Sequence, residues 1–374
     1  MNNNLVAYML KWYNAIKNRL LKERGVLKKL SCKQKKWYIS RSKKADFHLR
    51  KFNKRKKKRN PQKSNRHSTL SRKEKAQRKN HILVVPKVFS LTKNSDETLA
   101  FFKKVFDTIN RCKQYDWLMF DMEETEEITP DALMYLLALI KNLTKLTINK
   151  INCRGNLPQK QPARDYIQNS GFLGYMEYNG KKPEITNSEK RIQITCGETS
   201  DGKTAGIACE FVHTQCGITI LNTKSLYPML LELMANTNQH AYQYDVKMKR
   251  QWFIYAEALE DRVNFVFLDT GKGIPSTVKK NFAEIVSRIV NANDAKFIKS
   301  ALKGGFRTET GELHRGKGLP EIYNYCKNNK ISDLTIFSNR GKCVVNDSCE
   351  IKMEEIENFE GTLFSWSIKK EGNL

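Results

Sequence analysis

Three short strings in the last third of the chain constrain its fold more than any other feature. They occur in one order, and each sits at a different kind of secondary-structure boundary. In chain order they are Glu232-Leu-Met-Ala-Asn236-Thr-Asn-Gln-His240, Asp269-Thr-Gly271-Lys-Gly273-Ile274-Pro275 and Arg315-Gly316-Lys317-Gly318-Leu319. The first lies on a predicted helix, the second ends a predicted strand and the third opens a predicted helix. Together they predict an α/β fold in which distant segments form one pocket.

The first string predicts a polar face on an amphipathic helix over residues 226–242. Glu232, Asn236 and His240 are four residues apart and share that face. The amide oxygen of Asn236 can bind Mg²⁺, and Glu232 beside it can orient or deprotonate a water. Taken alone, the same pattern fits the solvated face of an ordinary helix.

The second string follows a continuous β-run, Val263–Leu268, which ends in Asp269. A carboxylate at a strand end can accept a hydrogen bond from an exocyclic amine. Gly271 and Gly273 let the backbone pass close to a flat ring, and Ile274 follows at the exit. The alternative is a plain strand-to-turn junction, since Asp-x-Gly is common in turns.

The third string places glycines at the start of a predicted helix over 320–327. Backbone N–H groups at a helix N-terminus can bind phosphate. The residues predicted to contribute are Arg315, Gly316, Lys317, Gly318 and Leu319. The alternative is a glycine-rich loop before a surface helix.

Together the strings resemble the N, G1 and G2 boxes of the GHKL superfamily, which includes gyrase, Hsp90, histidine kinases and mismatch-repair ATPases. The resemblance covers about residues 190–370. It implies an α/β sandwich that binds ATP and Mg²⁺, with residues 276–315 as a lid. It implies that Asn236 is the Mg²⁺ ligand, Asp269 the adenine-binding acid and Glu232 the catalytic acid. Gln239 departs from the pattern, because many histidine kinases place a phosphate-binding lysine there.

A competing motif lies upstream. The string Gly197-Glu-Thr-Ser-Asp-Gly202-Lys203-Thr204 satisfies the P-loop expression literally and follows a predicted strand, Arg191–Cys196. A true P-loop must open a helix. The following residues carry an early glycine and no helical charge pattern, so we expect a hairpin turn between two strands.

Strand and helix patterns alternate over 81–180, which predicts a small α/β domain with parallel strands. The expected strands are 82–89, 117–121 and 146–153, and the expected helices are 96–112, 129–145 and 163–168. The segment resembles a STAS domain, the fold of anti-sigma-factor antagonists, at Leu118–Asp121, at the helix start Thr129-Pro130 and at Arg164–Gly171. The family's phosphoacceptor serine would fall within Thr129–Ala132, which has none. We therefore expect a scaffold that binds a protein partner.

Residues 1–80 are predicted to form a basic arm. They hold 28 lysines and arginines and three acidic residues, so they carry +25 of the net charge of +28. Residues 4–23 have the spacing of an amphipathic basic helix, and Lys54–Arg59 is an unbroken basic run. Interleaved aromatic residues favour nucleic acid as the partner. The alternatives are a solvated tail without a fixed partner and an anionic membrane surface.

The composition limits the remaining classes. No apolar run reaches the roughly 20 residues of a membrane span, and no signal-peptide pattern is found. Nine cysteines without a CxxC pair argue against a disulfide framework and a zinc site, and a cytoplasmic location is expected. A linker over 180–188 separates the predicted domains 81–180 and 186–370.

The sequence therefore predicts an ATP- and Mg²⁺-binding protein that is an ATPase or an ATP-gated switch. One alternative is a serine/threonine protein kinase of the anti-sigma-factor type, since a STAS-like domain precedes a kinase-like one. Another is a non-catalytic nucleic-acid-binding adaptor. A sensor histidine kinase is not expected, because no helix carrying a phosphoacceptor histidine precedes the ATP domain. A homodimer is compatible with these predictions.

Overall fold

The computed structural model describes residues 78–113, 116–146, 151–176, 189–218, 225–239, 250–281, 292–306 and 318–370. The chain divides into two units, Met1–Ala76 and Gln77–Leu374, and only the second is described. The predicted arm therefore lies almost wholly outside the described residues. Within the described ranges the fold is mixed α/β, and no helix there is long and apolar enough to span a membrane.

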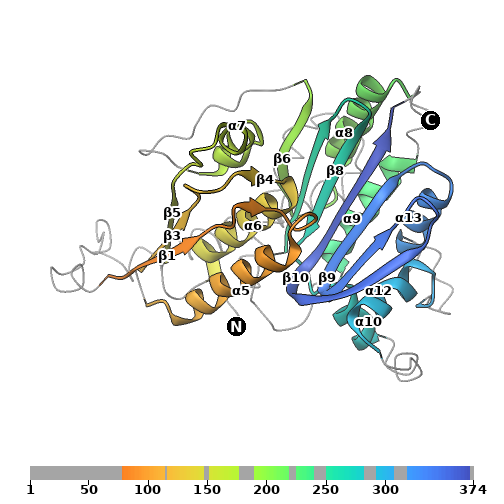
Figure 1. Cartoon of the computed structure of the whole chain (residues 1–374). Helices are drawn as coiled ribbons and strands as arrows, with labels where there is room; N and C mark the ends of the chain where they lie inside the picture. Colours follow the sequence, from red (N-terminus) through yellow and green to blue (C-terminus); the bar gives the residue numbers. More distant parts are fainter. Residues whose placement is uncertain are drawn as a thin grey trace, which may run out of the picture. The chain divides into compact units, whose positions relative to one another are not determined.

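Three short parallel strands form the first sheet, in the order β1, β3, β5 (Figure 1). They are β1 (Asn80–Val84), β3 (Trp117–Asp121) and β5 (Asn152–Gly155). Parallel neighbours need crossover connections, which the helices α5 (Ser95–Arg111) and α6 (Pro130–Leu146) supply. The predicted parallel α/β pattern is confirmed, including the bounds of β3 and the start of α6 at Pro130. Two short strands, β2 (Val88–Phe89) and β4 (Glu127–Ile128), pair beside this sheet.

The second sheet has five strands in the order β6-β7-β8-β10-β9, and every neighbouring pair is antiparallel. The strands are β6 (Arg191–Gly197), β7 (Trp252–Ala258), β8 (Arg262–Asp269), β9 (Ser332–Val345) and β10 (Ile351–Lys369). The predicted strands at 191–196 and 263–268 are confirmed. The last two strands, β9 and β10, are direct neighbours in this sheet.

Side chains of this sheet alternate between two hydrophobic cores. Trp252 and Ile254 of β7 pack with helices within residues 202–239 and 294–327, whereas Phe253 and Tyr255 pack with α5 and α6. Both faces of the sheet are therefore covered, which explains why β7 and β8 read as continuous apolar runs. The two segments that were expected as separate domains share one of these cores.

Helices cover the far face of the five-stranded sheet (Figure 1). They are α8 (Gly202–Cys216), α9 (Leu226–Gln239), α10 (Ile274–Asn281), α12 (Asp294–Leu302) and α13 (Gly318–Lys327). On the other side of the fold, α7 (Gln161–Asn169) and the 3₁₀ helix Phe172–Tyr175 complete the first layer. The helices predicted at 163–168 and 320–327 are confirmed.

The prediction of a hairpin after Gly197 is wrong, because the chain forms helix α8 there. Asp201 caps this helix: its carboxylate accepts hydrogen bonds from the Lys203 N–H at 3.0 Å and from the Thr204 hydroxyl at 2.8 Å. Small residues such as Ala205 and Ala208 form the buried stripe. This stripe lacks the large apolar residues and charge pairs that reveal most helices in a sequence.

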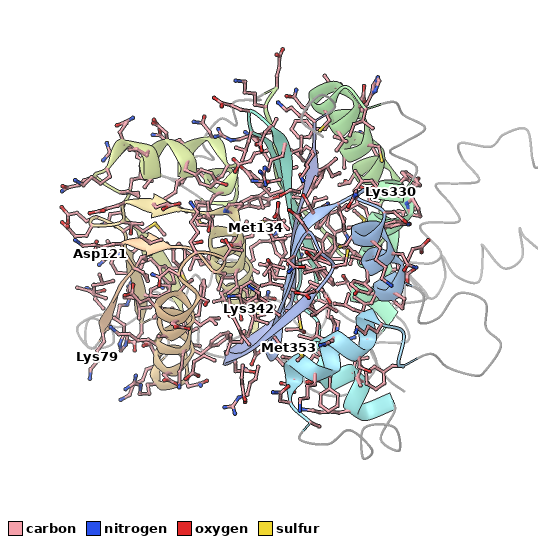
Figure 2. The ribbon with its side chains drawn as sticks, turned by 45° about the vertical axis from the view of Figure 1, so that its right-hand side comes forward. Lys79, Asp121, Met134, Lys330, Lys342 and Met353 are labelled. Carbon is pink, nitrogen blue, oxygen red and sulfur yellow. The ribbon has the colours of Figure 1, made fainter. Side chains whose placement is uncertain are left out.

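Helix α6 joins the two sheets. Its residues from Asp131 to Leu139 are all buried, and Met134 lies in the layer between the sheets (Figure 2). The ring of Tyr135 stacks on Phe359 of β10 at 4.2 Å, and its hydroxyl accepts a hydrogen bond from the Glu360 N–H at 3.0 Å. One side chain therefore provides both apolar and polar contact between the layers.

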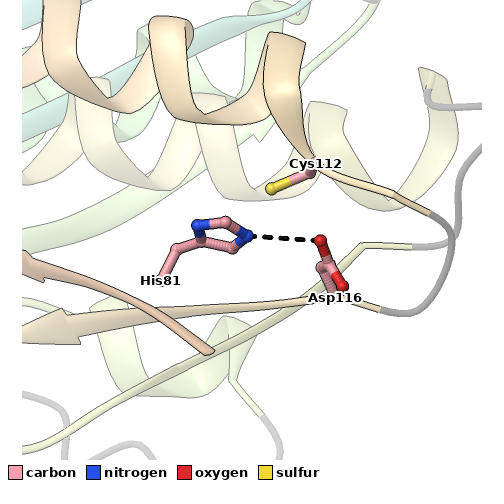
Figure 3. A group of neighbouring side chains, drawn as sticks. All are labelled: His81, Cys112 and Asp116. Atoms are coloured by element: carbon pink, nitrogen blue, oxygen red, sulfur yellow. Dashed lines mark hydrogen bonds and ion pairs between the residues drawn. The ribbon is translucent and has the colours of Figure 1, made fainter. Parts of the chain in front are cut away.

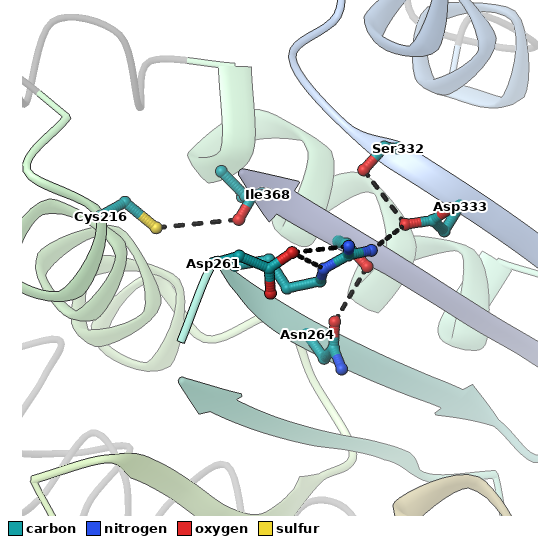
Figure 4. A network of polar contacts seen from close by, with 8 residues as sticks. Cys216, Asp261, Asn264, Ser332, Asp333 and Ile368 are labelled. Atoms are coloured by element: carbon teal, nitrogen blue, oxygen red, sulfur yellow. Dashed lines mark hydrogen bonds and ion pairs between the residues drawn. The ribbon is translucent and has the colours of Figure 1, made fainter. Parts of the chain in front are cut away.

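A polar network fastens the sheet near the C-terminal end of β10 (Figure 4). Arg262 donates to Asp261 at 2.7 Å and to Asp333 at 2.8 Å, which links β8 to β9. Next to it, the Ser367 hydroxyl donates to Asn264 at 2.9 Å, which links β10 to β8. These contacts lie at the sheet end opposite to Asp269.

We expect Tyr135 to be among the most stabilising residues of the layer contact. Tyr135→Ala should lower the free energy of unfolding by about 3–5 kcal/mol, because it leaves a cavity in a dry core. Tyr135→Phe should cost about 1–3 kcal/mol, because it leaves the Glu360 N–H without its acceptor. Urea denaturation measures both.

Tyr227→Ala is the matched control, because Tyr227 is 40% exposed and its loss should cost little. Equal losses at Tyr135 and Tyr227 would contradict the packing described above.

Candidate functional site

Helix α9 carries the first of the three strings. Glu232 and Asn236 lie one turn apart on it, and both side chains are half-buried. The fourth turn of the expected helix, including His240, lies outside the described residues. Two side chains that both offer oxygen atoms are thus placed side by side on a rigid element.

The end of the third string lies directly against Glu232. A Cβ atom added at Gly318 would come within 2.5 Å of the Glu232 Cγ and within 3.0 Å of its Oε1. Only glycine fits this approach between α13 and α9. Gly318 is buried and is also the first residue of α13, so the N-terminus of a ten-residue helix lies beside the Glu232 side chain.

The second string meets α9 at Thr237. Asp269 ends β8, and its carboxylate accepts a hydrogen bond from the Gly271 N–H at 2.8 Å. The hydroxyl of Thr237 is within hydrogen-bonding reach of both this carboxylate and the Leu233 carbonyl, which is at 3.3 Å. A hydroxyl has one proton to donate, and the charged acceptor binds it more strongly. The structure therefore brings parts of all three strings together around α9.

Asp269 is an unusual carboxylate. By surface area its side chain is half-buried, but its charged group sits deep among neighbouring atoms. Burial raises its pKa to about 6, and the Gly271 N–H, the Thr237 hydroxyl and the charge of Arg250 only partly offset this effect. A carboxylate held this way is a strong hydrogen-bond acceptor at neutral pH.

The loop after Asp269 is fastened to β9. Gly273 has φ of +83°, and a Cβ atom there would come within 2.5 Å of the Asn339 side-chain oxygen. The Ser338 hydroxyl accepts from the Ile274 N–H at 2.9 Å, and the Asn339 side chain accepts from the Ser276 N–H at 3.2 Å. The glycine-bearing turn therefore has one defined path from β8 into α10.

A further glycine outside the predicted strings supports Asp269 from behind. Gly361 of β10 has φ of +107°, and a Cβ atom there would come within 2.2 Å of the Asp269 carbonyl oxygen. The strand β10 is irregular next to this point. This contact could not be read from the sequence, because it depends on the pairing of β8 with β10.

Sequence reasoning also missed Arg250. Trp252 pairs with Asp269 across β7 and β8. Arg250 stands two residues before Trp252 of this pair, and its charge lowers the pKa of the Asp269 carboxylate. Its Nη1 atom is buried without a hydrogen-bond partner. A basic residue just before a strand is too common to be found without the pairing.

The remaining predicted residues are placed only in part. Ile274 opens α10 and Leu319 follows Gly318 in α13, and both are half-buried against the core. Arg315, Gly316 and Lys317 lie outside the described residues. The described parts of the expected lid are α10 and α12, which are joined by an ion pair between Lys279 and Asp294 at 2.7 Å.

The P-loop-like string is followed by a helix, as a P-loop requires, but a side chain already occupies the N-terminus of that helix. Although α8 begins within the motif, the Asp201 carboxylate takes up the N–H of Lys203 at the helix start. This negative group stands where a P-loop would hold phosphate. The preceding strand β6 is an edge strand antiparallel to β7, whereas a P-loop is part of a βαβ unit with parallel strands.

No protein-family model matches this chain, and a search of curated proteins finds no match either.

The raised pKa of Asp269 predicts a pH dependence of stability. Its folded value of about 6 is above the unfolded value of about 3.9, so the folded state binds the proton more tightly. The stabilisation is complete below the unfolded pKa and is lost as pH rises through the folded pKa. Asp269→Asn should abolish this loss. As pH rises from about 4 to 7, the free energy of unfolding of the variant should therefore increase by roughly 2 kcal/mol relative to that of the original chain. Urea denaturation at several pH values measures the difference.

Asp261→Asn is the control for this experiment. Hydrogen bonding to Arg262 lowers the pKa of Asp261, so ionisation of that group favours folding. This control should therefore be less stable than the original chain at neutral pH and approach it in acid. If Asp269→Asn were also less stable than the original chain at neutral pH and approached it in acid, the Asp269 carboxylate would not have the raised pKa described here.

Proposed function

We propose that residues 190–370 form an ATP-binding domain of the GHKL type, with the nucleotide held between α9, the end of β8 and the start of α13. The observation that carries this proposal is the meeting of the three strings on one helix. Gly318 abuts Glu232, and Asp269 lies beside Thr237 of the same helix. Three short patterns matched by chance would not be expected to lie next to one another in the folded chain.

The arrangement of elements supports the same proposal. An antiparallel sheet carries helices on the face toward which the side chain of Asp269 points. Residues at the end of β8 and on the overlying helix can then contact one ligand from two sides. In the loop from Asp269 to Ile274, Gly271 and Gly273 contribute backbone atoms only.

Each residue has a role in this proposal. The carboxylate of Asp269 accepts a hydrogen bond from the exocyclic amine of adenine, and the unpartnered Nη1 of Arg250 offers a donor beside it. Gly271 and Gly273 let the loop approach the ring. The N-terminus of α13 at Gly318 binds phosphate oxygens. The predicted contributions of His240, Arg315, Gly316 and Lys317 concern residues outside the described ranges.

Two side chains of α9 are suited to binding Mg²⁺ and to acid–base catalysis. Asn236 and Glu232 both offer oxygen atoms, which are the ligands that Mg²⁺ prefers. The missing side chain at Gly318 leaves backbone N–H groups next to Glu232 rather than a methyl group. The ion would neutralise phosphate charge. Glu232 would then take a proton from the attacking oxygen as that oxygen bonds to the terminal phosphorus and the bond to the bridging oxygen breaks.

The attacking oxygen decides between an ATPase and a serine/threonine kinase. Water would release phosphate, whereas a protein hydroxyl would become phosphorylated. In the STAS-like segment, the hydroxyl of Thr129 points to Asp131 at the start of α6. This contact supports the scaffold role that we propose for residues 81–180.

We expect Asn236→Ala to weaken ATP binding at least tenfold in the presence of Mg²⁺ and to change it little in a chelator. Asn324→Ala is the matched control, because Asn324 is an exposed amide on α13. Glu232→Gln should keep ATP affinity and lower turnover by about 10²–10⁴-fold. Isothermal titration measures binding, and labelled ATP followed into free phosphate and into protein separates hydrolysis from phosphotransfer. Unchanged Mg²⁺-dependent affinity in Asn236→Ala would refute the site.

We also propose that residues 1–80 bind nucleic acid, because +25 of the net charge is concentrated there. Replacing the six residues Lys54–Arg59 with glutamine should weaken binding to DNA or RNA and reduce its dependence on salt, by up to roughly 0.9 units of log–log slope per lost phosphate contact. Fluorescence anisotropy at several salt concentrations measures both. An unchanged slope would count against the arm, and selective binding to anionic vesicles would favour the membrane alternative.

A further inference from the structure

A group of three side chains in the first layer has the composition of a metal site. His81, Cys112 and Asp116 each offer one ligand atom, and these atoms all lie within 4.8 Å of one another (Figure 3). We propose that this group binds one divalent ion of the zinc type. The site lies on the three-stranded sheet and is separate from the proposed nucleotide pocket.

The fold brings the three residues together at one end of the parallel sheet. His81 pairs with Leu118 near the start of β3, and Asp116 directly precedes that strand. Cys112 caps the C-terminus of α5, which leads into the same turn. Parallel strands start at the same edge of a sheet, so a residue early in β1 and one just before β3 become neighbours.

The carboxylate of Asp116 is oriented before any ion binds. Its Oδ1 accepts from the Lys79 N–H at 3.0 Å, and its Oδ2 accepts from the Lys113 N–H at 2.9 Å. Each carboxylate oxygen can accept two hydrogen bonds, so Oδ2, which lies toward His81, can bind an ion beside its bond from the Lys113 N–H. Backbone donors that fix a ligating carboxylate are a regular feature of metal sites.

The distances suit zinc. The His81 Nε2 lies 3.2 Å from the Asp116 Oδ2. Two ligands at about 2.0–2.1 Å from a tetrahedral zinc ion are about 3.3 Å apart. A set of one imidazole, one thiol and one carboxylate favours zinc over Mg²⁺ or Ca²⁺, which prefer oxygen atoms alone. Three protein ligands leave the fourth position for water.

The exposure of these residues leaves a path for an ion, although their hydrogen bonds also fit a purely structural role. Asp116 is 4% exposed and His81 is 26% exposed, so an ion can enter from the histidine side of an otherwise dry site. The hydrogen bonds of Asp116 would also serve a purely structural turn anchor. A turn anchor would not bind Co²⁺ or Zn²⁺ through the Cys112 thiol, so metal binding that depends on this thiol distinguishes the two.

Cobalt(II) is the probe, because a thiolate–cobalt bond gives an intense near-ultraviolet absorption. The full chain, treated with chelator and kept reduced, is titrated with Co²⁺, and Zn²⁺ is then added. We expect one Co²⁺ per chain with thiolate absorption, displaced by Zn²⁺, and a higher thermal unfolding midpoint in Zn²⁺. Cys112→Ser should abolish the absorption, and His81→Gln should weaken binding at least 100-fold.

Two cysteine variants serve as controls. Cys216→Ser changes a buried thiol of α8 far along the chain, and Cys153→Ser changes the thiol on β5 that shares a sheet row with His81. Both should bind Co²⁺ like the original chain. The proposal is overturned if Co²⁺ gives no thiolate absorption, or if Cys112→Ser keeps it. Should Cys112→Ser fail to fold, undiminished binding in His81→Gln overturns the proposal by itself.

Discussion

The five-stranded sheet with both faces buried is the constraint on which the rest of the molecule depends. Successive side chains of β7 and β8 enter opposite cores, one shared with α5 and α6 and the other with α8, α9 and α13. A shift of one residue in register would exchange the two sets. The sheet therefore holds Asp269 at a defined depth and orientation at the end of β8, and this fixed position makes the candidate site possible.

Glycines set how closely the segments around that site approach. Gly318 lets α13 reach Glu232, Gly273 lets the loop rest on β9, and Gly361 lets β10 pass the backbone of Asp269. In each case an added Cβ atom would overlap a neighbour, and two of the three positions also have positive φ. The same lack of side chains leaves backbone groups facing the proposed ligand. Packing and the proposed binding thus depend on the same residues.

Strand β10 joins the two α/β segments. Tyr135 on α6 stacks on Phe359 of β10, and Phe359 follows closely on the ion pair between Lys103 and Glu357. The strand β10 also pairs with β8, which carries Asp269. A ligand that changes the sheet end would therefore act on a strand that α5 and α6 contact directly. This arrangement offers a physical route by which the proposed pocket could affect the first layer.

Much of the fold could be predicted from local patterns. The strand Trp117–Asp121, the helix start at Pro130 and the strand ending in Asp269 all have strong apolar periodicity or a clear capping signal. Helix α8 was missed because its buried stripe is made largely of small residues. Arg250 and the group at Cys112 were missed for a different reason, since their partners lie on strands that become neighbours only through sheet pairing.

The sequence by itself determined many of the helices and strands, where most of the charge lies and which residue types stand at the candidate pocket. These properties depend on periodicity and composition, which are local. Only the tertiary structure decided that Glu232 meets Gly318, that Arg250 lies beside Asp269 and that His81, Cys112 and Asp116 form one group. Such contacts depend on strand order and register, which arise when apolar surfaces far apart in the chain are buried together.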